Sequence, residues 1–137
     1  MHIAVRTSLP DNPLFIDGNA EQLGKTIMSL LNNGMYAIAK KYGKKAYPAE
    51  IGLALESKDG QAVIRLYDNG VGIEQSILDK IFDPFFTTKT TGEAAGIGLY
   101  LSKEIILNHH GQIAVRSEKD ELTEFTITLP LWEEKSV

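Results

Sequence analysis

The chain has 137 residues, of which 43% are hydrophobic and 23% are charged, a balance that fits one globular domain with its own core. Fourteen basic and eighteen acidic residues give a net charge of −4, which argues against a nucleic-acid partner. The absence of cysteine excludes disulfides and thiolate zinc sites. No apolar run is long enough to span a bilayer, so we expect no direct membrane contact.

Hydrophobic periodicity and turn signals predict an alternation of strands and helices. The predicted elements are, in chain order, a strand at 3–7, a long helix at 20–42, strands at 50–57 and 61–67, a short helix at 74–82, a helix at 98–108 and strands at 113–117 and 123–129. Either Asp17 or Asn19 can cap the long helix, whose apolar residues recur every three or four positions. Short turns between consecutive strands, such as Asp59-Gly60, favour antiparallel pairing.

We therefore expect an α+β fold, specifically a two-layer α/β sandwich in which helices cover one face of a mixed, mostly antiparallel sheet. The whole chain, 1–137, is predicted to be a single domain, and its polar tail, about 133–137, is predicted to be frayed.

A glycine-containing segment directly follows the strand at 61–67 and reads Asp-Asn-Gly-Val-Gly-Ile. Gly70 and Gly72 let the backbone approach a ligand where a β-carbon would clash. Asp68, at the end of the strand, can accept a hydrogen bond from an exocyclic amine. Asp-Asn-Gly is also common turn chemistry, so an ordinary turn is the alternative.

A second glycine cluster, Gly96-Ile97-Gly98-Leu99, leads into the predicted helix at 98–108. Such turns present free N–H groups and the positive end of the helix dipole to phosphate. The cluster is neither a Walker A loop nor a dinucleotide fingerprint, and a structural glycine pair is the alternative.

Two further segments carry unusual residues. Residues 82–89 combine three phenylalanines with a proline, two threonines and Lys89, as expected of a lid with a hydrophobic hinge. Asn33 lies in the middle of the long helix, where asparagine is a poor helix former. It is either a tolerated surface residue or a ligand.

Over about 19–130, these four segments resemble the ATP-binding catalytic domain of sensor histidine kinases, within the superfamily that includes DNA gyrase, mismatch-repair and heat-shock chaperone ATPases. Residues 68–73 match the first glycine box of that family, D-x-G-x-G-I, and 82–89 match its F box. Residues 29–33 stand at its N box, and 96–99 match the last part of its second glycine box. The resemblance implies a Bergerat-type ATP-binding fold and a kinase that binds Mg-ATP.

The resemblance also implies roles for individual residues. The residues it assigns to ATP binding are Asp68, Gly70, Gly72, Gly96, Gly98, Leu99 and Thr123, and it assigns Asn33 and Lys89 to catalysis. Asp68 would accept the adenine amino hydrogen, Gly72 would let the base lie against the backbone, and Thr123 would contact the adenine side through water. Asn33 would bind the Mg²⁺ ion that bridges the phosphates. Lys89 would meet the terminal phosphates.

The sequence departs from the family pattern at several positions. Ala94 replaces the first glycine of the second box, and Ser29 replaces the first asparagine of the N box. Gly34 stands where alanine is usual. Lys40 and Lys41 could face the phosphates, although a solvated helix end, where cations complement the dipole, is the expected interpretation.

No histidine has the flanking residues of a phosphoacceptor. His2, His109 and His110 lack the acidic neighbour and downstream proline of that motif, and the last two are expected to cap a helix electrostatically or lie at the surface. The resemblance therefore implies an acceptor histidine on a separate dimerisation domain upstream, and a response regulator as partner of the full-length protein. It implies a cytoplasmic location and leaves membrane anchoring of the parent protein open.

Two alternatives remain at this point. Free-standing serine kinases that bind sigma factors share this fold, but they place a glutamate four residues before the N-box asparagine, where this chain has Ser29. The other alternative is a nucleotide-binding module without transferase activity, which would follow if Ala94 impairs the lid.

Overall fold

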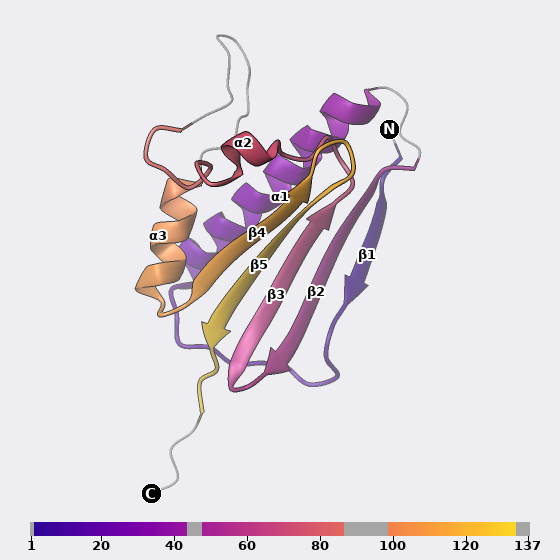
Figure 1. Ribbon diagram of the computed structural model, residues 1–137. Coiled ribbons are helices and arrows are strands. Elements are labelled where there is room, and N and C mark those ends of the chain that lie inside the picture. The colour runs from indigo at the N-terminus through magenta and orange to yellow at the C-terminus, as the bar shows by residue number, and fades with distance from the viewer. Residues whose placement is uncertain (1, 44–47, 87–98, 134–137) are drawn as a thin grey trace, which may run out of the picture.

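The computed structural model of the protein describes residues 2–43, 48–86 and 99–133. Its elements are β1 (Ala4–Ser8), α1 (Ala20–Tyr42), β2 (Glu50–Lys58), β3 (Gln61–Asp68), α2 (Gln75–Leu78), α3 (Tyr100–Asn108), β4 (Gln112–Glu118) and β5 (Leu122–Pro130) (Figure 1). Within these residues, five strands form one sheet in the order β1-β2-β3-β5-β4. β1 pairs with β2 in parallel, and the other neighbouring strands are antiparallel. Helices lie on one face of the sheet, which confirms the predicted α+β sandwich (Figure 1).

The central strand β3 runs from the hydrophobic core to a polar end. Residues two apart on a strand share a face, so Leu66 and Asp68 both point to the helix side of the sheet. Across the ladder Leu66 pairs with Phe125, and both side chains are buried in the core. Asp68 pairs with Thr123, one step beyond that core. The apolar residues on this face of β3 therefore end at a buried carboxylate, that of Asp68.

The long helix α1 has the predicted bounds, and Asn19 rather than Asp17 caps it. The Asn19 side chain accepts a hydrogen bond from the Gln22 N–H at 3.0 Å, which satisfies one of the free donors of the first turn. Gly43, with φ +57°, ends the helix. The residues buried on the side that packs against the sheet are Thr26, Leu30, Gly34 and Ile38.

The short helix predicted over 74–82 is wrong in its extent, because α2 covers only Gln75–Leu78. The Lys80 N–H donates to the Ile77 carbonyl at 2.9 Å, and the Asp83 N–H donates to the Lys80 carbonyl at 3.0 Å. These bonds join residues three apart and close tight turns instead of α-helical turns. Ile81 is nevertheless fully buried, so tertiary packing holds this segment.

The described part of the F box divides its three phenylalanines between core and surface. Phe82 meets Phe125 edge to face, with ring centroids 6.4 Å apart, and Phe86 packs against the same core. Phe85 is fully exposed at a positive φ of 67°. Phe82 and Phe86 therefore pack against the core, whereas Phe85 faces solvent.

His109 has a different role from the electrostatic cap or surface residue expected for it. Its Nε2 accepts a hydrogen bond from the Asn19 N–H at 3.0 Å, and its Nδ1 lies 2.7 Å from the Ile105 carbonyl. Because Nε2 accepts, Nδ1 carries the proton and donates. The imidazole thus ties the end of α3 to the start of α1, while His110 is exposed as expected.

None of the helices within the described ranges is long and apolar enough to cross a membrane.

Candidate functional site

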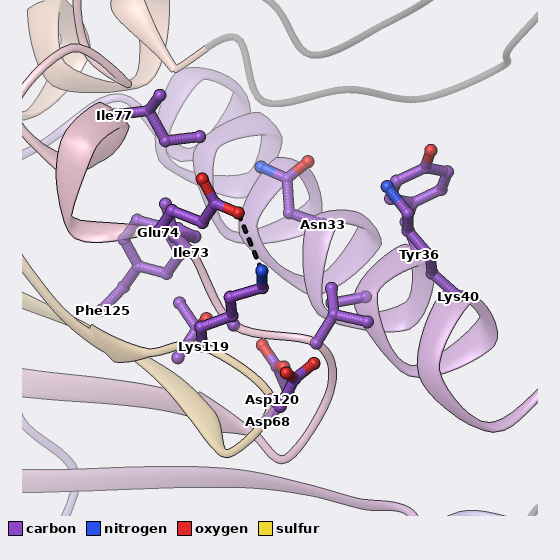
Figure 2. A pocket seen from close by; sticks show the side chains of 14 residues that line it. Asn33, Tyr36, Lys40, Asp68, Ile73, Glu74, Ile77, Lys119, Asp120 and Phe125 are labelled. Carbon is purple, nitrogen blue, oxygen red and sulfur yellow. Dashed lines mark ion pairs between the residues drawn. The ribbon is translucent and has the colours of Figure 1, made fainter.

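A cavity of about 350 Å³ opens between α1, the loop after β3, the start of α2 and the turn between β4 and β5. Its volume is in the range of small-molecule sites. Figure 2 shows Asn33, Tyr36 and Lys40 along the α1 side of this cavity and Glu74 and Lys119 on another side. The remaining lining residues are Ala37, Asp68, Val71, Gly72, Ile73, Ile77, Asp120, Thr123 and Phe125. The lining combines apolar side chains with polar and charged ones, so the cavity suits a ligand that has both an apolar face and polar groups.

Asp68 is the buried acidic residue of this cavity and is 6% exposed. Its Oδ1 accepts the Gly70 N–H at 2.9 Å. Burial raises the pKa of Asp68 from its ordinary 3.8 to about 6, although the bond from Gly70 and the nearby charge of Lys41 both act to lower it. A carboxylate this poorly solvated, with acceptor capacity remaining, favours a ligand that brings a hydrogen-bond donor.

Thr123 faces Asp68 across the ladder and belongs to a hydroxyl network. The Ser117 hydroxyl donates to the Leu122 carbonyl at 2.7 Å and accepts the Ile73 N–H at 2.8 Å. Because the Ser117 proton is committed, Thr123 is the donor in the 2.8 Å bond between the two hydroxyls. Thr123, which lines the cavity, can therefore act there as an acceptor through the lone pairs of its hydroxyl oxygen.

The two glycines of the first box make close approaches to the protein itself. A β-carbon at Gly70 would lie 2.5 Å from the Ala37 carbonyl carbon, and one at Gly72 would collide with the Glu118 carbonyl. Gly72 also has a positive φ of 70°. Both glycines therefore have a packing reason within the fold, at α1 and at the β4–β5 turn, and of the two Gly72 lines the cavity.

Asn33 lies on the face of α1 that borders the cavity and is half-buried. Its amide oxygen is the kind of hard ligand that Mg²⁺ takes, and one such ligand fits an ion held mainly by phosphates and water. No cluster of three or more acidic, histidine or cysteine residues that could hold a metal occurs in the described segments. Ser29, one turn earlier, does not line the cavity.

The structure does not bring every predicted site residue to the cavity. Leu99 is fully buried in the core at the start of α3, and its N–H donates to the Ile81 carbonyl at 3.3 Å. Lys89, Gly96 and Gly98 lie outside the described residues, as does the Ala94 departure.

Sequence reasoning missed several residues that build the site. Ser117 organises the hydroxyl network, and Glu74 forms an ion pair with Lys119, Oε1 to Nζ 2.9 Å, at the cavity wall (Figure 2). Lys41 was expected at a solvated helix end, but its Nζ donates to the carbonyls of Asn69 and Asp120. These residues lie in segments far apart in sequence, so no local motif marks them.

The fold and the site together define an α+β sandwich with a small-molecule-sized cavity at one end of its central strand, and comparison with known proteins gives its family. The sequence model of the histidine kinase-, DNA gyrase B- and HSP90-like ATPases matches residues 18–133, and the chain belongs to this family.

The chain is similar to known bacterial kinases. It is 34% identical over 123 residues to sporulation kinase D of Bacillus subtilis, covering 90% of this chain and 22% of that protein. It is 39% identical over 122 residues to signal transduction histidine-protein kinase AtoS of Escherichia coli, covering 88% of this chain and 19% of that protein. The chain thus spans about a fifth of the length of these relatives.

Solved structures confirm the fold. The nucleotide-free catalytic domain of histidine kinase ThkA superposes with a TM-score of 0.77 at 22% identity, covering 93% of this chain and 80% of that one. A mycobacterial sensor histidine kinase, MprB, superposes with a TM-score of 0.73 at 24% identity, covering 94% of this chain and 82% of that one.

Proposed function

We propose that this chain is the single-domain, ATP-binding catalytic part of a two-component sensor histidine kinase. It binds Mg-ATP and donates the γ-phosphate to a histidine on a separate dimerisation and phosphoacceptor domain. The observation that carries this proposal is the buried Asp68 at the end of β3, beside Thr123 and Gly72, in a chain whose family assignment covers 18–133. The sensor kinases among its relatives support the choice within that family.

In the proposed complex the adenine ring enters between the apolar walls, Val71 and Ile73 among them. Asp68 accepts the hydrogen of the adenine amino group, which selects ATP over GTP. Thr123 contacts the same side of the base through water. Desolvation of Asp68 favours this pairing, because the ligand adds a donor to a carboxylate whose Oδ1 is bonded to the Gly70 N–H.

The triphosphate extends toward the α1 side of the cavity. Asn33 would hold Mg²⁺, which would supply positive charge to offset part of the negative charge of the triphosphate. The backbone N–H groups at Gly96 and Gly98 and the ammonium group of Lys89 are assigned to the phosphates, with Leu99 anchoring the start of α3. The protein then acts by positioning: the bond from the γ-phosphorus to the β–γ bridging oxygen breaks, a phosphorus–nitrogen bond to the acceptor imidazole forms, and ADP leaves.

The alternative reading, a serine kinase of the sigma-factor-binding class, requires a general base at the position of Ser29. Serine is a poor base at neutral pH, and Ser29 does not line the cavity. The partners we propose are therefore the acceptor domain and, through the full-length protein, a response regulator, in the cytoplasm where ATP is available.

The test is phosphotransfer in trans. The chain, with γ-labelled ATP and Mg²⁺, is incubated with the dimerisation domain of its full-length protein, and with the same domain carrying an acceptor His→Gln substitution as control. Label on the intact acceptor domain alone supports the proposal. ATP binding without label on either domain would leave a nucleotide-binding module and overturn the kinase assignment.

A further inference from the structure

Lys41, in the last turn of α1, joins two loops that lie far apart in the sequence. Its Nζ donates to the Asn69 carbonyl at 3.2 Å and to the Asp120 carbonyl at 2.6 Å. Asn69 immediately follows Asp68, and Asp120 is at the turn between β4 and β5. The Lys41 ammonium group therefore connects the end of α1, the loop after β3 and the β4–β5 turn.

Both loops that Lys41 contacts form walls of the cavity. Val71 and Gly72 line it from the loop after β3, and Lys119 and Asp120 line it from the β4–β5 turn. Lys41 itself is not among the lining residues, so it contacts the backbone of these two loops from outside the cavity.

The carbonyl of Asn69 is fixed from other directions as well. It accepts a hydrogen bond from the Tyr42 hydroxyl at 3.2 Å, and the Asn69 side chain donates to the Pro48 carbonyl at 2.8 Å. The Asp120 turn is held to the same loop by its N–H, which donates to the Val71 carbonyl at 2.5 Å. Among the described residues, the Lys41 side chain is the one that donates to both loops at once.

We propose that Lys41 is a positioning residue for nucleotide binding, which sets the spacing between the loop after Asp68 and the β4–β5 turn so that Asp68 meets the adenine amino group. This inference rests on the proposed function. Charged donors make strong hydrogen bonds to carbonyls, and an ammonium group with three donors can hold both at once. The charge of Lys41 also acts to lower the pKa of Asp68, which keeps the carboxylate available as an acceptor.

A cation that merely complements the helix dipole would have a different signature. Its loss would change the free energy of unfolding and would leave the relative affinities for different nucleotides unchanged. A residue that positions Asp68 changes how well the site distinguishes ligands with and without the amino group.

The experiment compares Lys41→Met, Lys41→Arg and the control Lys25→Met. Lys25 lies on the same helix, is 73% exposed and pairs only with Glu21 among the ion pairs recorded in the described segments. Calorimetry and competition measure the affinity of each variant, with Mg²⁺ present, for ATP and for purine riboside triphosphate, which lacks the amino group. Thermal unfolding is followed in parallel.

We expect Lys41→Met to weaken ATP binding roughly tenfold, equivalent to about 1.4 kcal/mol, and purine riboside triphosphate binding much less. Lys41→Arg, which retains charged donors, should restore most of the preference for ATP. Lys25→Met should match the wild type. Equal losses for both ligands in Lys41→Met, or no loss, would overturn the inference while wild-type ATP binding still supports the proposed function. Failure of the wild type to bind ATP would overturn both.

Discussion

Asp68 is buried and can accept more hydrogen bonds than the protein supplies to it. Burial destabilises its charged form when no ligand is bound. Its Oδ1 has one protein donor, the Gly70 N–H. A β-carbon at Gly34 would lie only 3.3 Å from Oδ2, so the unusual glycine at this N-box position gives the carboxylate room. The residue is therefore arranged for a partner that enters the cavity.

Replacement of Asp68 by alanine should weaken ATP binding. A hydrogen bond to a charged group contributes about 1.5–3 kcal/mol, which corresponds to roughly tenfold to more than a hundredfold in affinity. Calorimetric titration with Mg-ATP measures the effect, and Asp11→Ala, at an exposed position, is the control. Unchanged affinity in Asp68→Ala would remove the proposed adenine contact.

The raised pKa of Asp68 also predicts how stability depends on pH. Between pH 3.8 and about 6 the folded protein retains a proton on this carboxyl that the unfolded chain has lost. The protonated Asp68 therefore makes its largest contribution to the free energy of unfolding below pH 3.8. This contribution is lost as the pH rises through about 6, and the loss amounts to about 3 kcal/mol at most.

Urea unfolding of the wild type and of Asp68→Asn at pH values from 4 to 7.5 tests this sign. Asparagine can still accept the Gly70 N–H but carries no charge, so the variant should gain stability relative to the wild type as the pH rises. A stability difference that does not change with pH would contradict the prediction.

Asn33 should matter for magnesium more than for folding. Because the residue is half-buried on a helix face, Asn33→Ala should change the free energy of unfolding little, and alanine has the higher helix propensity. We expect Asn33→Ala to lose the gain in ATP affinity that Mg²⁺ provides over EDTA, together with most phosphotransfer. The neighbouring, exposed Asn32→Ala is the matched control. A loss of activity only in proportion to early unfolding would indicate a structural role.

At the scale of the elements, Gly70 and Gly24 differ in how closely other atoms pack around them. A β-carbon at Gly70 would lie 2.6 Å from that of Ala37, where α1 contacts the loop after β3. A β-carbon at Gly24, in the interior of α1, would meet nothing within 4 Å. The same substitution should therefore have opposite effects at the two sites.

Gly70→Ala should destabilise the protein by about 1–3 kcal/mol, as overpacking does, and push the Asp68 loop away from α1. Gly24→Ala should stabilise it by about 0.5–1 kcal/mol through the lower backbone entropy of alanine. Denaturant unfolding of both variants gives the two signs. If Gly70→Ala were neutral, the close contact with Ala37 would not constrain the loop.

The elements show what a sequence can predict and what it cannot. The bounds of α1 follow from periodicity and a cap, and Asp68 follows from its place after a strand, because these signals are local. Lys41 and Ser117 have partners in segments that only the folded sheet brings near, so their roles have no local signal. For α2, periodicity overstated the helix, since Ile81 is buried by tertiary packing and not by a helical face.

For the whole molecule, we expect phosphotransfer only in trans. His109 is engaged at Asn19 and Ile105, and no histidine of the sequence has the flanks of a phosphoacceptor. Holding the γ-phosphate without a positioned nucleophile leaves the barrier high, because positioning two reactants is itself worth about 7–11 kcal/mol. Incubation of the chain alone with γ-labelled ATP should give neither labelled chain nor rapid phosphate release. Either product would place the whole reaction within this chain.

The pairing partners of β3 determine when the cavity can form during folding. On one side β3 pairs with β2, which a tight turn joins to it, so this hairpin can form early. On its other side it pairs with β5, and Gln61 faces Pro130 near the end of the described chain. That ladder requires closure of a long loop, which topology makes slow. Because Asp68 and Thr123 meet only across this ladder, we expect the cavity to form only after β5 has docked on β3, later than the β2–β3 hairpin.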